Sequence, residues 1–356
     1  MTANQIETSP QVLELLQFAV PYDAAVAVVG PEVEAIGRRI VAPLSPDGQS
    51  PADLSDEAAV ARLEALRAQD FEFLVVSPSA YAWLDARPGF RDHLEAEYRL
   101  VVRDPDACAV YALHGASGRT GADGLPLPPV DMIRMTSGLR KAAGPDAVYR
   151  RFERSSADTA GWIRDKLTGH GTQLDERSAL LDFGCGCGRV ARRWSELSGA
   201  VHGTDYNPLL VQWCNAHLAF ADFATNALEP PLPYADDSFD FLYSISIFTH
   251  LDEPLQVPWM RELVRVVRPG GLILITVSGE EHVRSLPGWE QFRPSFEAGE
   301  LVVTKPERSG SNACAVYHPL GYVRDKLTRG LELLDHEPGV SQAGGQDGVL
   351  LRTPVK

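Results

Sequence analysis

Apolar positions in the first third of the chain alternate between helical spacing and short continuous runs. Helical spacing indicates amphipathic helices, and continuous runs bounded by polar residues indicate buried strands. The expected elements are helices over 12–20 and 56–69 and strands over 24–29, 71–77, 98–103 and 108–113. This pattern predicts a small α/β accessory domain over residues 1–113. Its candidate turn, Val29-Gly30-Pro31-Glu32, has one glycine and a proline, so we do not expect a cofactor loop there.

A glycine- and proline-rich segment follows over residues 114–130. It contains four glycines and three prolines with few apolar residues, which is typical of a linker. We therefore place the domain boundary there. Residues 131–167 are then expected to be helical, with Trp162, Ile163 and Leu167 on an apolar face.

Strand-like and helical patterns alternate again in the remainder of the chain. The expected strands are 180–183, 200–205, 239–245 and 272–277, the expected helices are 190–197, 255–267 and 320–329, and apolar runs close the chain at 331–334 and 348–351. Strands separated by helices imply right-handed crossovers and a parallel sheet, whose ligands lie outside the carboxyl ends of the strands. We expect every motif described below to lie on that edge.

The most informative motif is the loop after the strand that ends at Asp182. Gly184, Gly186 and Gly188 are spaced two apart, and glycines let a backbone approach a ligand lying across a strand end. Such a run also occurs in tight connections that bind nothing. A carboxylate at Asp182 would repel a phosphate but suits the ammonium and sulfonium end of S-adenosylmethionine. The next strand ends at Asp205, where a carboxylate can hold both ribose hydroxyls.

Four motifs in this order resemble the class I S-adenosylmethionine-dependent methyltransferases. They are residues 182–188, Asp205, the PYADDSFD run at 233–240 and the RPGGL run at 268–272. Residues 246–251 with 259–263 further resemble a bacterial branch that acts mostly on small molecules or sugars. The resemblance covers about residues 149–352. It implies a Rossmann-like, seven-stranded, mostly parallel sheet in a methyltransferase domain over 131–356, leading helices that cap the cofactor cleft, and S-adenosyl-L-methionine as cofactor.

The resemblance also implies a set of cofactor-binding residues. These are Asp182, Gly184, Cys185, Gly186, Gly188, Asp205, Tyr206, Asn226, Ala227 and Ser244. Tyr206 is placed to stack on adenine, although a tyrosine that begins a helix can also simply pack. Asn226 stands where the family commonly has an acid, and its amide oxygen can still accept a hydrogen bond from the adenine amino group. Asp222 is the alternative for that contact.

The candidate catalytic residues follow the strand that carries Ser244. Methyl transfer is an in-line displacement that depends on alignment, and a hydroxyl nucleophile also benefits from proton removal. His250 is the leading candidate base, although in Phe-Thr-His-Leu it can also only fix the start of a helix. Glu280 and His282 are second-rank candidates, and His318 ranks below them.

Residues 279–317 interrupt the alternation of strands and helices. The segment contains Trp289, Phe292, Phe296 and Tyr317 and follows a strand at its carboxyl end, which suits a substrate lid. Its aromatic residues suggest an apolar or ring-bearing acceptor. Aromatic residues in a long loop can equally serve only to anchor it.

Composition restricts the partners and the compartment. The net charge of −15 opposes binding to nucleic acid and anionic membranes. The five cysteines are odd in number, so we expect no disulfide framework and a cytoplasmic location. Because no second cluster of cysteine or histidine lies at metal-ligand spacing from Cys185-x-Cys187, we expect no metal site there. Residues 1–10 do not resemble a secretion signal, and no apolar run reaches the roughly 20 residues of a membrane helix.

The sequence thus predicts an enzyme of secondary metabolism that methylates a small molecule, with a hydroxyl of a natural product or sugar favoured and N- or C-methylation left open. An inactive protein that binds or senses S-adenosylmethionine is the alternative. A nicotinamide-dependent oxidoreductase is disfavoured because the loop lacks Gly-x-Gly-x-x-Gly spacing. A homodimer is left open.

Overall fold

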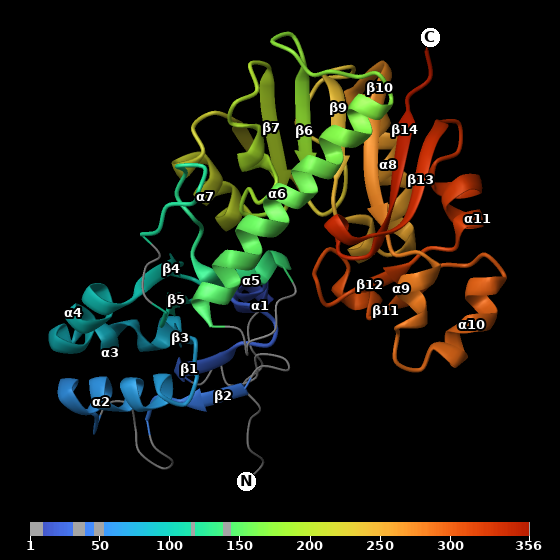
Figure 1. The fold of residues 1–356 in the computed structure, drawn as a ribbon. Coiled ribbons are helices and arrows are strands. Elements are labelled where there is room, and N and C mark those ends of the chain that lie inside the picture. Colours follow the sequence, from blue (N-terminus) through green and yellow to red (C-terminus); the bar gives the residue numbers. More distant parts are fainter. Residues whose placement is uncertain (1–9, 31–39, 46–52, 115–117, 138–143, 356) are drawn as a thin grey trace. The chain divides into compact units, whose positions relative to one another are not determined.

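The computed structural model describes residues 10–355 apart from 31–39, 46–52, 115–117 and 138–143, and the chain divides into two compact units (Figure 1). One unit comprises residues 1–119 with 127–148, and the other comprises 120–126 with 149–356. Pro31 and Glu32 of the candidate turn lie outside the described residues, as do residues 115–117 of the glycine- and proline-rich segment.

The first unit is built on a five-stranded sheet in the order β2-β1-β3-β5-β4. β1, β2 and β3 are parallel, whereas β5 runs antiparallel to both β3 and β4. Short apolar side chains of β1 and β3 are fully buried, which forms the core of this unit. The elements are α1 (Pro10–Ala19), β1 (Ala25–Val29), β2 (Ile40–Pro43), α2 (Asp56–Arg67), β3 (Phe73–Val76), α3 (Tyr81–Asp85), α4 (Pro88–Glu97), β4 (Arg99–Arg103), β5 (Ala109–Ala112) and α5 (Val130–Ser137).

Two expectations for this part of the chain were wrong or incomplete. The short strand β2 was not predicted, because its four residues carry no alternation to distinguish them from a loop. The continuous helix expected over 131–167 is instead two helices, α5 and α6 (Pro145–Gly169), because Pro145 begins a new helix after the non-helical Gly144. Residues 138–143 between them are not described.

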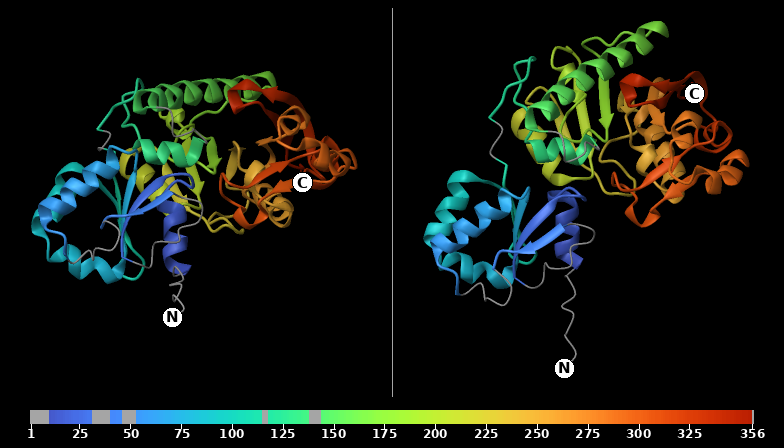
Figure 2. Two further views of the ribbon diagram at one scale, coloured as in Figure 1. Left: turned by 90° about the horizontal axis from the view of Figure 1, so that it is seen from below. Right: turned by 60° about the horizontal axis from the view of Figure 1, so that its bottom comes forward.

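The second unit is built on the expected seven-stranded, mostly parallel sheet, and its strands lie in the order β13-β14-β10-β9-β6-β7-β8 (Figures 1 and 2). All pairings are parallel except those of β14 with β10 and β13. The strands are β6 (Ala179–Phe183), β7 (Ala200–Asp205), β8 (Asp222–Thr225), β9 (Phe239–Ser244), β10 (Val267–Val277), β13 (Glu332–Val340) and β14 (Gln346–Arg352), and the main helices are α6, α7 (Pro208–His217) and α8 (Glu253–Val266).

Both faces of this sheet are buried by helices. Alternate residues of β6 enter different cores: Leu180 packs with Ile163 of α6, and Leu181 packs with Leu263 of α8. Two expected helices take tighter or wider forms. The turn after the glycine loop is the 3-10 helix η4 (Ala191–Trp194), and α11 (Leu320–Tyr322) continues as the π-helix η7 (Val323–Leu327). Among the described helices, none has both the length and the apolar character needed to cross a bilayer.

Residues 279–317 fold as a small subdomain with its own apolar cluster. It contains α9 (Glu280–Arg284), α10 (Trp289–Glu297) and an antiparallel hairpin of β11 (Val302–Thr304) and β12 (Ala315–Tyr317). Val283, Phe296, Val302 and Tyr317 are buried together, and Trp289 and Phe292 pack against them. These aromatic residues therefore stabilise the subdomain itself.

The PYADDSFD and RPGGL motifs do not lie on the carboxyl edge of the sheet, so that expectation was wrong. In the parallel register Val267 is paired with Phe239, which puts both motifs at the starts of β9 and β10. There Asp240 accepts a hydrogen bond from the backbone nitrogen of Ala179 (2.6 Å) and pairs with Arg268 (2.6 Å). Through these contacts the two motifs stabilise the amino edge of the sheet.

The segment 120–126 is fixed to the second unit by Arg192 of η4. The Arg192 side chain is fully buried, and its guanidinium donates to both carboxylate oxygens of Asp123 (2.6 and 2.7 Å) and to the carbonyls of Leu125 and Pro126. A buried guanidinium needs all of these acceptors, so the contacts hold residues 120–126 in place. This part of the predicted linker is therefore ordered.

We predict that Arg192→Met destabilises the second unit by about 3 kcal/mol or more, because it leaves the Asp123 carboxylate with only the more distant Arg193 as a cationic partner (3.7 Å). Urea unfolding followed by tryptophan fluorescence measures this change, and Arg177→Met at an exposed position is the matched control. Equal unfolding midpoints for the two variants would contradict the prediction.

Candidate functional site

The loop after β6 turns sharply by placing three glycines in the left-handed region. Gly184, Gly186 and Gly188 have φ angles of 80°, 55° and 75°. The backbone nitrogens of Gly184 and Cys185 both donate to the carbonyl of Thr204 at 2.8 Å, which holds the loop against the end of β7. Residues with a side chain would be strained here, so the glycines are required by the backbone path.

Two of the glycines also make room for protein side chains. A Cβ at Gly184 would lie 2.1 Å from Cδ1 of Ile247, and a Cβ at Gly188 would lie 2.5 Å from Cδ1 of Leu218. Packing therefore accounts for these two positions without a ligand. Gly186 has a different role, because its backbone nitrogen donates to Oδ2 of Asp205 at 2.8 Å.

Asp205 links the glycine loop to the segment after β7. Its Oδ1 accepts a hydrogen bond from the backbone nitrogen of Asn207 (2.9 Å) while its Oδ2 binds Gly186, and the residue is 8% exposed. Burial raises the pKa of Asp205, and the two N–H donors partly offset this effect. Each carboxylate oxygen retains a further lone pair, so the group can also accept the hydroxyls of a ribose.

Asp182 already has partners within the protein. Its Oδ2 accepts a hydrogen bond from the hydroxyl of Tyr243 on β9 (2.8 Å), which in turn accepts from Nε1 of Trp194 (3.2 Å). Burial raises the pKa of Asp182 to about 7, against the opposing effects of Tyr243 and Arg189. The carboxyl group therefore ties β6 to β9, and its contact with the ammonium group of a cofactor stays a prediction.

Three buried oxygen atoms without hydrogen-bond partners in the described chain lie at the carboxyl edge of this sheet. They are Oγ1 of Thr204 on β7, Oγ of Ser244 on β9, and Oδ1 of Asn226, which directly follows β8. Unpaired buried polar atoms are costly, so such a group at one edge indicates ligand-binding positions. The amide nitrogen of Asn226 binds the carbonyl of the exposed Ala227 (2.7 Å), which leaves Oδ1 as an acceptor suited to an adenine amino group. The residues here fit S-adenosylmethionine.

The register separates the two candidates for that amino group. Asp222 begins β8 opposite His202, whereas Thr225 ends β8 opposite Asp205. Asp222 therefore lies about 10 Å along the strand from the carboxyl edge, which favours Asn226, and the contact with adenine stays a prediction. Tyr206 follows Asp205 directly, and burial raises the pKa of its hydroxyl to about 12. Its stacking on adenine stays a prediction.

His250 lies in the 3-10 helix η5 (Phe248–His250), just beyond the carboxyl end of β9. Its Nδ1 is 2.6 Å from the carbonyl oxygen of Cys314 in the inserted subdomain. A carbonyl can only accept, so Nδ1 carries the proton and Nε2 has a free lone pair. Burial lowers the pKa of His250, partly offset by the bond to Cys314, so the imidazole is neutral at pH 7.

A buried glutamine supports the turn that carries His250. Gln256 of α8 is fully buried, and its Nε2 donates to the carbonyls of Phe248 (2.8 Å) and Leu251 (2.6 Å). Its Oε1 must then accept from Nε2 of His318 (3.2 Å), which leaves Nδ1 of His318 unprotonated, buried and without a partner. Burial lowers the pKa of His318 to about 3, so the ring stays neutral at pH 7, with its single proton on Nε2 and with Nδ1 able to accept a hydrogen bond.

The two other candidate catalytic residues lie on α9. The Glu280 side chain is 69% exposed and pairs with Arg284 (2.5 Å). The ring of His282 lies 6.2 Å from that of Tyr317, within the subdomain.

Gln256, Thr204 and the Cys314 carbonyl were not predicted from the sequence. A single buried glutamine or backbone carbonyl has no sequence signature, whereas Thr204 was visible next to Asp205.

Ser246 holds the start of this turn in an unusual conformation. Its φ of 64° is left-handed, which is uncommon for a residue with a side chain. Its backbone nitrogen donates to Oγ1 of Thr276 (2.7 Å), and its hydroxyl donates to Oε1 of Gln346 (3.0 Å). Strained residues that are held by several contacts are common at functional sites, which agrees with a site at this edge.

We predict that His318 makes stability depend on pH below its unfolded pKa of 6.5. The folded protein keeps His318 neutral and the unfolded chain does not, so stability is lost as pH falls from 6.5 towards 3, by up to about 1.4 kcal/mol per pH unit. Asp182 changes stability with pH in the opposite direction, because its pKa is raised in the folded protein. Denaturant unfolding of the wild type is therefore compared with His318→Gln, which retains a donor for Gln256. We expect the variant to lose less stability than the wild type between pH 6.5 and about 5, and identical slopes would refute the assignment.

Among the described residues, no group of three potential ligands is placed to hold a metal ion.

A family model described as a methyltransferase domain matches residues 181–275, which contain the glycine loop, Asp205, Asn226 and His250. The chain is 35% identical over 159 residues to methyltransferase GfsG of Streptomyces halstedii, covering 41% of this chain and 55% of the relative. It is 27% identical over 177 residues to sterol 24-C-methyltransferase ERG6A of Gibberella zeae, and the match covers 47% of this chain and 43% of that relative.

The chain spans about half the length of the curated relatives it matches. Among solved structures, a 1,6-didemethyltoxoflavin N1-methyltransferase of Burkholderia thailandensis is 14% identical with a TM-score of 0.40, covering 57% of this chain and 79% of that one. The family match falls on the strands and loops that form the site described above. Residues 181–275 therefore match a methyltransferase domain, and they lie in a seven-stranded sheet of the class I S-adenosylmethionine-dependent methyltransferase type.

Proposed function

We propose that this protein transfers the methyl group of S-adenosylmethionine to a hydroxyl group of a small molecule, with His250 as the general base. The observation that carries the proposal is the Nδ1 contact of His250 with the carbonyl of Cys314 (2.6 Å). It fixes the tautomer in which Nε2 is unprotonated, at the edge of the sheet where the cofactor-binding residues lie.

The cofactor would be held at the ends of β6, β7, β8 and β9. The Asp205 carboxylate suits the ribose hydroxyls, and Oδ1 of Asn226 suits the adenine amino group. The hydroxyl of Ser244, which is buried and unpaired, suits the methionine portion. When bound, S-adenosylmethionine supplies a methyl group on a positively charged sulfur, which is the electrophile of the reaction.

The role of His250 is to remove a proton from the acceptor. Nε2 accepts the proton of the acceptor hydroxyl as the oxygen attacks, and the ring becomes an imidazolium. The Nδ1–H bond to Cys314 then donates from a charged ring to a carbonyl, which is stronger than the same bond from a neutral ring. The carbonyl thus both orients the base and stabilises its protonated form.

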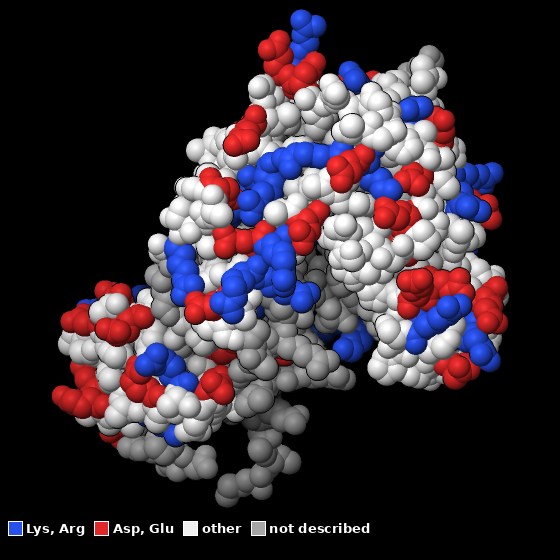
Figure 3. All heavy atoms as spheres, viewed as in Figure 1, with Lys and Arg blue, Asp and Glu red and all other residues white. Residues whose placement is uncertain are grey.

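Charge and the inserted subdomain support a small-molecule acceptor. The net charge of −15 disfavours polyanionic substrates, and acidic and basic side chains are interspersed over α9 and α10 without a continuous basic patch (Figure 3). One relative is named for the methylation of a sterol, which is also a small molecule. We propose that residues 279–317 cover the acceptor, that the first unit is an accessory domain, and that the methyltransferase domain is the second unit, residues 120–126 with 149–356, rather than the whole of 131–356.

We predict that Asp205→Ala weakens binding of S-adenosylhomocysteine at least about 100-fold, because hydrogen bonds to a charged group contribute about 1.5–3 kcal/mol each. Isothermal titration calorimetry with the full chain measures the affinity, and circular dichroism confirms folding. Asp222→Asn, which removes a charge at the opposite end of the sheet, is the control and should bind normally. Unchanged affinity of Asp205→Ala would refute this cofactor site.

We predict that His250→Ala lowers methyl transfer by about 100-fold or more while retaining affinity for S-adenosylhomocysteine. Turnover is measured with radiolabelled S-adenosylmethionine and a pool of hydroxylated metabolites, and His282→Ala tests the competing candidate. Because burial lowers the pKa of His250, the wild-type rate should fall only below pH 6.5. Full activity of His250→Ala would reject the base, and cofactor binding without any labelled product would favour the sensor alternative.

A further inference from the structure

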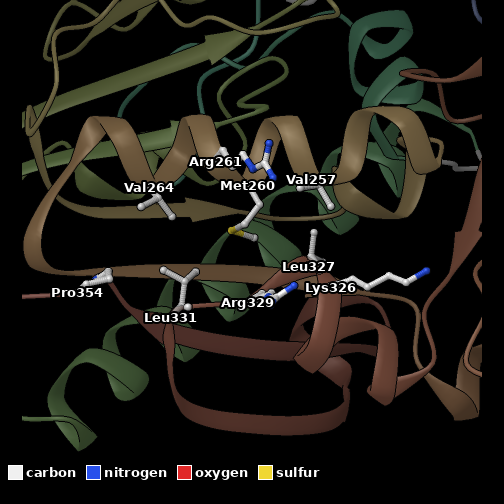
Figure 4. Close-up of a pocket in the computed structure, with 10 residues that line it drawn as sticks. Val257, Met260, Arg261, Val264, Lys326, Leu327, Arg329, Leu331 and Pro354 are labelled. Atoms are coloured by element: carbon white, nitrogen blue, oxygen red, sulfur yellow. The ribbon is translucent and has the colours of Figure 1, made fainter.

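A cavity of about 310 Å³ lies between α8 and the segment that follows η7, away from the residues described above (Figure 4). It is lined by Val257, Met260, Arg261, Val264, Lys326, Leu327, Arg329, Gly330, Leu331 and Pro354. None of these residues belongs to the predicted cofactor or catalytic set. Pro354 follows β14, whose Arg352 is paired with Leu272 near the start of β10, so this part of the cavity wall lies towards the amino edge of the sheet.

The floor of the cavity is apolar because of the spacing of residues on α8. Val257, Met260, Arg261 and Val264 are at positions i, i+3, i+4 and i+7, so they form one stripe of the helix. Figure 4 shows Met260 and Val264 pointing from α8 towards Leu327 and Leu331. Met260 and Leu327 are 3% and 2% exposed, which makes the floor part of the main core.

The rim of the cavity carries positive charge. Arg261, Lys326 and Arg329 line it, and no lining residue is acidic. Lys326 is 3.7 Å from Glu253 and lies over the ring of Tyr322, so its charge is already engaged. Arg261 and Arg329 are exposed and form no ion pair or hydrogen bond with the described residues. Two available guanidinium groups beside an apolar floor are unusual in a protein whose net charge is −15.

We propose that this cavity binds a small amphipathic carboxylate, with its alkyl chain over Met260 and Val264 and its carboxylate between Arg261 and Arg329. Guanidinium groups bind carboxylates through paired, charge-assisted hydrogen bonds. A volume of about 310 Å³ is at the lower end for ligand pockets, which suits a medium-length chain. This site is independent of the proposed methyl transfer.

Met260 provides a local probe for this proposal. The chain has four methionines, at positions 1, 132, 135 and 260, so the full protein labelled with ¹³C-methyl methionine gives a simple NMR spectrum, and Met260→Leu assigns the relevant signal. Titration with sodium octanoate should shift the Met260 methyl signal in a saturable way and leave those of Met132 and Met135 unchanged. Acetate, which lacks the chain, and octanol, which lacks the charge, should bind at least about tenfold more weakly.

Two sets of variants test the contacts separately. Arg261→Gln with Arg329→Gln should weaken octanoate at least about tenfold, whereas Arg324→Gln, an exposed charge on η7 outside the cavity, should have little effect. Val264→Trp should fill the cavity and abolish the shift, and thermal unfolding confirms that each variant is folded. The proposal is overturned if octanoate and octanol bind equally, if the double variant binds as the wild type does, or if sedimentation shows a dimer that Val264→Trp dissociates.

Discussion

The site depends on one buried carboxylate that accepts two backbone hydrogen bonds. Asp205 binds the N–H groups of Gly186 and Asn207, and so it holds the loop after β6 and the loop after β7 in one arrangement. Parallel strands end with their loops side by side, and this bridge adds to the hydrogen bonds from the Gly184 and Cys185 nitrogens to the Thr204 carbonyl. The left-handed glycines follow from this constraint, because only that backbone path brings the Gly186 nitrogen to the carboxylate.

This arrangement concentrates negative charge beneath the loop. Asp182 and Asp205 are both buried at the ends of neighbouring strands, and burial raises the pKa of each. Arg189 and the Tyr243 hydroxyl counteract that effect at Asp182, whereas only backbone donors do so at Asp205. A ligand that brings positive charge and hydroxyl donors to this edge would relieve an unfavourable arrangement, whereas a pyrophosphate would worsen it. The electrostatics of the folded site thus support the same cofactor as the family match.

The alternation of strands with helices and the position of the glycine loop could be predicted because each depends on local patterns. Apolar runs between helical segments predicted the sheet, and the spacing of Gly184, Gly186 and Gly188 with Asp205 predicted where its loops converge. The edge on which the PYADDSFD and RPGGL motifs lie was predicted wrongly, because both motifs come before their expected strands in the sequence and therefore lie at the amino ends of those strands. Gln256 and the Cys314 carbonyl were beyond prediction, since their roles arise from contacts between segments distant in sequence.

With His250 as the proposed base, the same long-range contacts would make the inserted subdomain part of the catalytic geometry rather than only a cover. The Gly310 nitrogen donates to the carbonyl of His250 (2.7 Å), and the Cys314 carbonyl accepts from its Nδ1 (2.6 Å). Ser309 and Asp252 exchange two further hydrogen bonds of 2.9 Å beside them. The path of residues 309–314 therefore determines which nitrogen of His250 is unprotonated. In this way a segment that shapes the proposed acceptor site would also determine the tautomer of the proposed base, His250. A substitution in residues 309–314 would then affect both the choice of acceptor and the basicity of His250.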